Sequence, residues 1–265
     1  FIIPLDDVDK VLTDSVGSKM ANLGEIIKST DIKVPPGFVL TAHAYRTFLA
    51  HNSLQAEIDR RMQTADLSDL ESLYKLSSEI QQLIIRSPLP VALEAAISEA
   101  WQSLADEQGQ SITVALRSSA IGEDTEVSFA GQFATLLNVP ARSLLNAYKE
   151  VLASKYNSGA VLYRMRCGLD DRTTPMAVII MAMVAAQASG VVYTRNPSQP
   201  EQTDLQISAI RGLGEYLMSG DSAPYAIGVC RRTGRITPHH TAHQSHWITA
   251  LPQGGTRLEP LAPED

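Results

Sequence analysis

The order of the predicted elements indicates an α+β fold, with helices in the first half of the chain and strands in the second. Residues 53–107 are rich in Leu, Ala, Glu and Gln, which are strong helix formers. After Ser111 the apolar segments become short and β-branched, as strands are. The chain has no internal repeat, heptad pattern or low-complexity tract. Helices followed by strands is an order typical of α+β proteins.

Size and charge limit the classes of function. The chain has 265 residues, 44% of them hydrophobic, which is enough for one large domain or two moderate ones. Its net charge of −7 argues against a general nucleic-acid binder, whose surface is normally basic. An acidic protein can still bind an anion such as ATP through a local group of cations and backbone N–H groups. We therefore expect no nucleic-acid partner.

Cysteine usage and hydropathy predict a cytoplasmic protein with no membrane partner. Cys167 and Cys230 lie far apart and form no CxxC motif, which favours free buried thiols in a reducing compartment over a disulfide. No apolar run approaches the ~18–20 residues that span a bilayer. The first residues, "FIIPLDDVDK", lack the basic region of a signal peptide.

The first half of the chain predicts five helices and a strand. One helix begins after Gly17 and Ser18, and its apolar face carries Met20, Leu23, Ile26 and Ile27. The segment "VPPGFVLTAHAYRTFL" predicts a short strand and then a helix with Thr41 as its N-cap. Three more helical patterns follow: "LQAEIDRRM", "LESLYKLSSEIQQLIIRS" and "ALEAAISEAWQSLADE".

The second half predicts strands around one long helix. The runs "SITVALRS" and "FATLLNV" are strand-like, and residues 141–166 form a helical pattern with a break near residues 157–159. Two dense apolar runs, "MAVIIMAMV" and "SGVVYTRNP", are expected in the core of a sheet. The run "LQISAIRGLGE" is a strand ending in glycines, and "YAIGVCRRTGRITPHH" is a hairpin that turns at Thr233 and Gly234.

Arg117 is the first candidate for a functional residue, because it ends an apolar strand. A guanidinium there presents a rigid fork of donors that suits phosphate oxygens. Ser118 and Ser119 add hydroxyl groups, and Thr135 offers another. Gly131 would let the backbone approach a ligand closely. The alternative is an internal ion pair of Arg117 with Glu123 or Asp124.

Lys19 is the second candidate, because it lies in the first turn of a predicted helix. Backbone N–H groups and the helix dipole favour an anion at that place, and a lysine adds a point charge. The segment is not a Walker A loop, since GxxxxGK[ST] occurs nowhere in the chain. The alternative is a solvated surface lysine.

Two further segments are weaker signals. "GLGE", which ends in Glu215, permits close backbone approach to a ligand, but it also fits an ordinary glycine-rich turn between strand and helix. A patch of four histidines has spacings that could hold zinc, although Pro238 and the absence of interleaved cysteine or carboxylate favour ordinary surface. These are His239, His240, His243 and His246. We assign no metal ligands.

Five segments, taken in order, resemble the N-terminal ATP-binding region of the phosphoenolpyruvate synthase and pyruvate phosphate dikinase family. They are "GSKMANLGE", "VPPGFVLTAHAYRTFL", "RSSAIGEDTEVSFAGQFATLLNV", "MAVIIMAMV…ASGVVYTRNP" and "GLGE…SG". The third is the most specific, and the resemblance covers almost the whole chain. Rifampicin phosphotransferases share this region.

The resemblance implies an ATP-grasp fold, in which two α+β subdomains hold ATP between their sheets. We expect an N-terminal subdomain at residues 1–185 with a helical insertion at about 42–108, and the start of a second subdomain at 186–265. It also implies a reaction in which Mg-ATP phosphorylates a histidine on a separate swivelling domain. That domain passes the phosphoryl group to pyruvate on a pyruvate-binding domain, or to another acceptor.

The family's site residues carry over by position. Lys19 and Arg117 match its phosphate-binding lysine and arginine and are the expected catalytic pair. The other expected nucleotide contacts are Ser118, Gly131, Thr135, Met181 and Glu215. At Met181 the family has a glutamine that contacts the nucleotide, and at Ser18 it has the second glycine of GGK.

Several family segments are not found in this sequence. These are the magnesium-binding DIEW-like segment, the QSRP-like segment, the swivelling domain and the pyruvate-binding barrel. Neither His43 nor His246 lies in the context of the phosphorylated histidine. We expect a part of a larger protein, or one subunit, that does not complete turnover alone. The alternative is a non-catalytic nucleotide-binding or regulatory module, and a histidine-patch metal protein is a third hypothesis.

Overall fold

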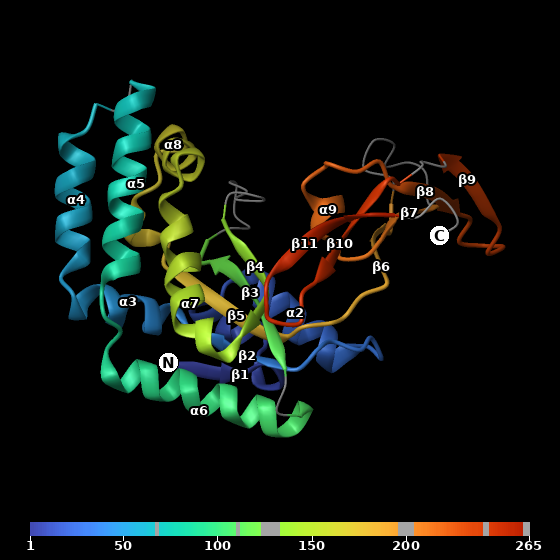
Figure 1. The fold of residues 1–265 in the computed structure, drawn as a ribbon, viewed down its shortest axis with the longest axis horizontal. Coiled ribbons are helices and arrows are strands. Elements are labelled where there is room, and N and C mark those ends of the chain that lie inside the picture. The colour runs from blue at the N-terminus through green and yellow to red at the C-terminus, as the bar shows by residue number, and fades with distance from the viewer. Residues whose placement is uncertain (67–68, 110–111, 123–132, 196–203, 241–243, 262–265) are drawn as a thin grey trace. The chain divides into compact units, whose positions relative to one another are not determined.

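The computed structural model describes residues 1–66, 69–109, 112–122, 133–195, 204–240 and 244–261. The chain forms two compact units, Phe1–Met183 and Val184–Asp265 (Figure 1). Both contain helices and antiparallel strands, which confirms the predicted α+β class. Over the described residues, every helix is too short or too polar to cross a lipid bilayer.

The first unit is built on a five-stranded antiparallel sheet with the order β1-β2-β5-β3-β4. Its strands are β1 (Ile2–Pro4), β2 (Gly37–Leu40), β3 (Thr113–Ala120), β4 (Thr135–Pro140) and β5 (Met176–Ala182). The predicted strands β2 to β5 are confirmed. The short strand β1 was not predicted, because three residues carry too little pattern to be recognised.

Eight α-helices accompany this sheet in the described residues. They are α1 (Thr13–Val16), α2 (Ser18–Ser29), α3 (Ala42–His51), α4 (Leu54–Thr64), α5 (Leu70–Arg86), α6 (Val91–Gln108), α7 (Leu144–Ala153) and α8 (Ser158–Arg166). Thr41 caps α3 as predicted, since its Oγ1 accepts from the Ala44 amide at 3.4 Å. The expected break in the long helix is confirmed, because α7 passes through a 3₁₀ turn at Ser154–Tyr156 before α8 begins.

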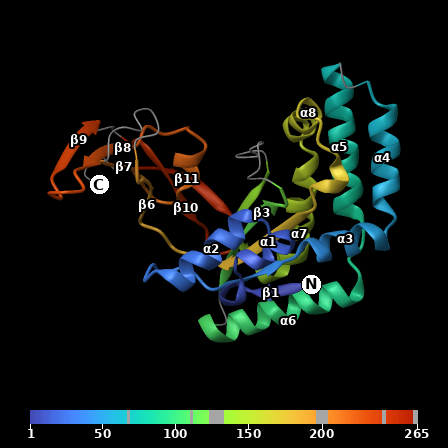
Figure 2. The ribbon, with the colours of Figure 1, turned by 180° about the vertical axis from the view of Figure 1, so that it is seen from behind.

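The two faces of the sheet bury different cores. One face meets α3 to α7 in a large apolar cluster that contains Leu116, Val178 and Ile180. The other face meets α1 and α2 in a smaller cluster that contains Val39 and Ile179. Helix α7 lies in front of the sheet in Figure 1, and α1 and α2 lie in front of it in the reverse view of Figure 2. Adjacent residues of β5 therefore serve opposite layers.

A buried ionic cluster joins the helices to the segment before β5. Lys155 is 1% exposed, and its Nζ lies 3.0 Å from Oδ1 of Asp171 and donates to the Tyr45 hydroxyl at 3.1 Å. The Tyr156 hydroxyl donates to Oδ2 of Asp171 at 2.8 Å, and Nη2 of Arg164 lies 3.7 Å from Oδ1. Burial alone would raise the pKa of Asp171, but the charges of Lys155 and Arg164 outweigh it and lower that pKa.

The second unit has a four-stranded antiparallel sheet, a short helix and a hairpin. The sheet has the order β6-β7-β8-β9, with β6 (Ala188–Tyr193), β7 (Leu205–Arg211), β8 (Tyr225–Val229) and β9 (Ile236–His240). Helix α9 spans Glu215–Met218, and β10 (His246–Ala250) pairs with β11 (Thr256–Pro260). The hairpin of β8 and β9 is confirmed, with Gly234 at φ +68° in its turn. The hairpin of β10 and β11 was not predicted.

One sequence expectation about this unit is wrong. The run "SGVVYTRNP" was expected in the core of a sheet, but β6 is an edge strand, with Val192 55% and Tyr193 48% exposed. An apolar run does not by itself indicate burial on both faces, because an edge strand of an antiparallel sheet can leave one face open.

Candidate functional site

Arg117 lies in β3, next to the edge strand of the first unit's sheet. Its cross-strand neighbours are Thr135 in β4 and Ile179 in β5. Directly paired residues of an antiparallel sheet extend from the same face, and residues two apart on a strand share that face. Met181, two residues after Ile179, therefore shares it as well. The register brings three predicted site residues, Arg117, Thr135 and Met181, to one face.

That face is the one covered by α1 and α2, which connects it with Lys19. Helix α2 begins at Ser18, and its side chains Met20 and Ala21 belong to the small core with Ile179. Lys19, in the first turn, is exposed, as is Arg117. The first turn of an α-helix leaves amide N–H groups without intrahelical partners and favours anions. The structure thus places a helix N-terminus and two exposed cations on one side of the sheet.

The two serines after Arg117 lie on opposite faces. Ser118 pairs with Val178 and lies on the side of the large core, where it is 9% exposed. Ser119 lies on the side of Arg117 and α2 and is fully buried. Within the described part of the chain, its Oγ has no hydrogen-bond partner. Period-two alternation along β3 puts Ser119, and not Ser118, on the face of Arg117.

Some of the predicted site falls outside the described residues. Gly131 is there, and so are Glu123 and Asp124, the alternative partners of Arg117. Among the described residues, no carboxylate forms an ion pair with Arg117. Thr135 is exposed and Met181 is half-buried.

Glu215 belongs to the second unit, where the structure explains the glycines before it. Gly212 has φ +79°, and a Cβ there would lie 2.6 Å from the carbonyl oxygen of Ile248 in β10. The Gly212 oxygen accepts from Ser189 Oγ at 2.7 Å. Glu215 is exposed and accepts from Thr256 Oγ1 at 3.4 Å. The glycines thus serve a tight strand-to-helix turn, which was the alternative interpretation of this motif.

The cysteines and histidines add little to a site. Both cysteines are free, as predicted, but Cys167 is exposed, so the expectation of two buried thiols is wrong. It follows α8 at the surface rather than packing in the core. His246 contacts Ser245 Oγ through Nδ1 at 3.0 Å, and His243 lies outside the described residues. The part of the chain that is described contains no group of three metal-ligating side chains.

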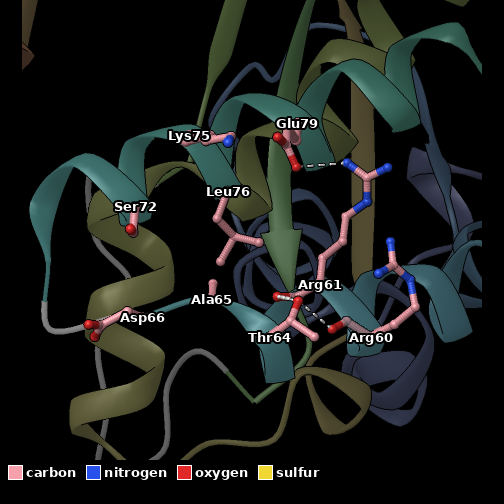
Figure 3. Close-up of a pocket in the computed structure, with 9 residues that line it drawn as sticks. All are labelled: Arg60, Arg61, Thr64, Ala65, Asp66, Ser72, Lys75, Leu76 and Glu79. Atoms are coloured by element: carbon pink, nitrogen blue, oxygen red, sulfur yellow. Dashed lines mark hydrogen bonds and ion pairs between the residues drawn. The ribbon is translucent and has the colours of Figure 1, made fainter.

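A cavity of about 410 Å³ lies elsewhere, between α4 and α5 (Figure 3). The two arginines that line it are already paired, since Arg60 contacts Glu57 at 2.7 Å and Arg61 lies 2.6 Å from Glu57 and 3.1 Å from Glu79. Figure 3 shows the Arg61 guanidinium directed at the Glu79 carboxylate. Hydrogen bonds from Arg60 and Arg61 lower the pKa of Glu57 to about 2. This neutralised surface lacks the cationic excess of an anion site.

Comparisons with known proteins find relatives that match nearly the whole chain. The chain is 35% identical over 262 residues to a rifampicin phosphotransferase of a Streptomyces species, covering 98% of this chain and 30% of that protein. It is 34% identical over 261 residues to a probable phosphoenolpyruvate synthase of Methanocaldococcus jannaschii, covering 97% of this chain and 22% of the relative. It is 38% identical over 227 residues to a phosphoenolpyruvate synthase of Aeropyrum pernix, covering 84% and 28%.

By name, one of these relatives is a phosphotransferase and two are phosphoenolpyruvate synthases, and the chain spans between 22% and 30% of their length. The family model for the pyruvate phosphate dikinase AMP/ATP-binding domain matches residues 13–265, which is nearly the whole sequence. The predicted resemblance is confirmed. The chain belongs to the family of pyruvate phosphate dikinase AMP/ATP-binding domains.

Proposed function

We propose that this chain binds Mg-ATP as the phosphoryl donor of a dikinase-type enzyme related to phosphoenolpyruvate synthase. One observation carries the proposal: the strand register puts Arg117 on the face of the sheet that α2 covers, where Lys19 occupies the first helical turn. Two cations and a helix N-terminus on one side of a sheet suit a polyphosphate. Membership of an AMP/ATP-binding family supports the same ligand.

Each of these residues would make a different contact with ATP. Arg117 binds phosphate oxygens through its fork of donors, and Lys19 adds a point charge. Thr135, beside Arg117, contributes a hydroxyl, and Met181 lies along β5 where the base of the nucleotide would pack. Phosphoryl transfer depends mainly on positioning and on stabilising charge at the transferred group, which these groups provide.

The remaining site residues fit less directly. Ser118 faces the other core, so we propose no contact of its hydroxyl with the nucleotide. Gly131 keeps its proposed backbone contact with ATP. Glu215 keeps its proposed contact with the nucleotide, and 1–185 and 186–265 remain the proposed ATP-grasp subdomains. Magnesium enters this proposal together with ATP, as part of the substrate.

The complete reaction needs further domains, and the relatives are long enough to contain them. We propose that a swivelling domain supplies the histidine that accepts the phosphoryl group, and that a pyruvate-binding domain or its equivalent supplies the final acceptor. Both belong to the rest of the protein or to a partner subunit, in the cytoplasm. The names of the relatives offer two acceptors, pyruvate and rifampicin.

The test is calorimetric titration of the 265-residue chain with ATP, with and without Mg²⁺. Arg117→Ala should weaken binding by about 1–3 kcal/mol, the contribution of a charge-assisted hydrogen bond, and Lys19→Ala should act in the same direction. Arg46→Ala, which removes an exposed arginine of α3, is the matched control and should bind like the parent. Equal binding by the Arg117 variant and the parent would refute the assignment of the phosphate clamp.

A second function, that of a nucleotide-binding or regulatory module without catalysis, is favoured by one residue. Met181 stands on the site face where the family has a glutamine, and a thioether cannot donate a hydrogen bond to an adenine edge. Such a module would bind nucleotide but would not transfer the γ-phosphoryl group when a family swivelling domain is added. Phosphohistidine formed on that domain from γ-labelled ATP would exclude it.

A further inference from the structure

The start of α2 approaches the sheet closely at Gly17 and Ser119. Gly17 is buried with φ +80°, a conformation that side chains disfavour. A Cβ there would lie 2.3 Å from Ser119 Oγ, 3.1 Å from the Ala120 oxygen and 3.2 Å from the Ser119 oxygen. Gly17 therefore allows the start of the helix to rest directly on the end of β3.

Gly17 is also the single residue between two helices. Its amide donates to the Thr13 oxygen at 2.8 Å, which ends α1, and its own oxygen accepts from the Ala21 amide at 3.0 Å, which begins α2. Any change of its backbone would move the first turn of α2. Lys19 is two residues further along, in that turn.

The other side of the contact leads to Arg117. Ser119 lies two residues after Arg117 on the same face of β3, about 7 Å along the strand. Its side chain is fully buried, and among the described residues its Oγ has no hydrogen-bond partner. A polar atom is thus kept without a hydrogen bond where the helix meets the strand. If packing were the only role of Ser119, alanine at this position would serve as well.

We propose that Gly17 and Ser119 form a positioning joint that sets the place of Lys19 relative to Arg117. Neither residue would touch the nucleotide, because both are buried. Their effect on ATP would pass through the first turn of α2, and in this respect the inference rests on the proposed function. A displacement of about 1 Å at a positioning element can cost about a hundredfold in activity, so a close contact there has consequences for binding.

Helix α2 offers a matched control for simple packing. Gly24, on the same helix, is also buried, and a Cβ there would lie 2.3 Å from the Val8 oxygen. Gly17→Ala and Gly24→Ala therefore each place a Cβ 2.3 Å from an oxygen atom, the first just before α2 and the second in the middle of α2. Only the first overlap lies next to Lys19 and Arg117.

The first experiment compares these two variants in the 265-residue chain by urea unfolding and by titration with Mg-ATP. Both should lose stability, but Gly17→Ala should lose at least about tenfold more ATP affinity than Gly24→Ala. In a Lys19→Ala background, the extra loss from Gly17→Ala should shrink, because the cation that it misplaces is gone. Equal losses of affinity in the two glycine variants would overturn the proposal.

The second experiment needs no nucleotide and uses a milder change. Ser119→Ala removes the atom that a Cβ at position 17 would meet first. Hydrogen exchange of the peptide covering residues 13–24 should be faster in Gly17→Ala than in the parent, and Ser119→Ala should reverse part of that increase. The reversal is partial because the strained φ and the two carbonyl contacts remain. No coupling between the two substitutions would overturn the joint, whether or not ATP binds.

The two experiments separate the two proposals. If the parent does not bind ATP, the proposed function fails, while coupled hydrogen exchange would still support the joint. If the parent binds ATP and the exchange is uncoupled, the joint fails alone.

Discussion

The two faces of the first unit's sheet differ in what they bury and in what they expose. On one face, Leu116, Val178 and Ile180 pack under α3 to α7 in a continuous apolar core. On the other face, α1 and α2 cover a smaller cluster, and beside it Arg117 and Thr135 remain exposed. Helices cover the face that carries the large cluster, whereas the face that carries the small cluster is only partly covered.

This difference separates stability from ligand binding within one sheet. Substitutions on the large face should unfold the unit without changing the chemistry of the other side. Substitutions on the small face should change the place of the cations as well. Alternate residues of a strand provide matched pairs for testing this, because they share the backbone and differ in the face they occupy.

The largest effect is expected on the large-core side, at the buried ionic cluster. Asp171→Asn should lower the free energy of unfolding by about 3–5 kcal/mol, because it leaves Lys155 and Arg164 buried without their counter-charge. The ATP affinity of the folded variant, measured well below its unfolding transition, should be unchanged. Urea unfolding and calorimetry measure the two quantities.

The neighbouring aspartate is the control for this prediction. Asp170 is exposed and caps the 3₁₀ turn Asp171–Thr173 by accepting from the Arg172 amide at 3.0 Å. Asparagine caps as well as aspartate, so Asp170→Asn should change stability by less than about 0.5 kcal/mol. A similar loss in both variants would mean that the cluster contributes no special stability.

The same cluster predicts a dependence on acid. The pKa of Asp171 is lowered in the folded state, so its contribution is fully present above the ordinary carboxyl pKa of about 3.9 and is lost as pH falls through the folded value. The gap in stability between the parent and Asp171→Asn should therefore narrow below about pH 4. A gap that stays constant down to the acid unfolding of the parent would contradict the ion pair.

A matched pair on β5 compares the faces directly. Ile179 and Ile180 are both fully buried and adjacent, but Ile179 faces α2 and pairs with Arg117, while Ile180 lies in the large core. Each change to alanine should cost about 2–5 kcal/mol of stability. Only Ile179→Ala should also weaken ATP binding, measured by calorimetry below the unfolding transition. Equal effects on ATP would mean that the faces are not functionally distinct.

The smallest effect is expected at the nucleotide base. Met181→Gln restores the residue that the family has on this face and should strengthen ATP binding by about 0.5–1.5 kcal/mol, the net contribution of one hydrogen bond. GTP is the control ligand, because its base presents different donors and acceptors. If GTP gains as much as ATP, the glutamine does not discriminate between the bases.

The sequence predicted most elements of the fold because their signals are local. The helical face of Met20 and Leu23, the cap at Thr41 and the break after Ala153 depend on neighbouring residues. The family resemblance also depends on short motifs in a fixed order, which are local signals, and it was confirmed. Strand β1 and the hairpin of β10 and β11 escaped, since a short strand acquires its identity from its partner.

What the sequence by itself determined is the chemistry available: an arginine in a strand, a lysine in a first helical turn and a family of nucleotide-binding domains. The expectation that Arg117 ends its strand was wrong, because β3 continues through paired residues to Ala120. The tertiary structure alone decided which of these groups share a face. Period-two alternation divides β3 into two sets and separates Ser119 from Ser118, but only pairing with β4 and β5 and the packing of α2 show which set meets α2. Local pattern cannot decide this, because long-range contacts determine what each face of a strand packs against.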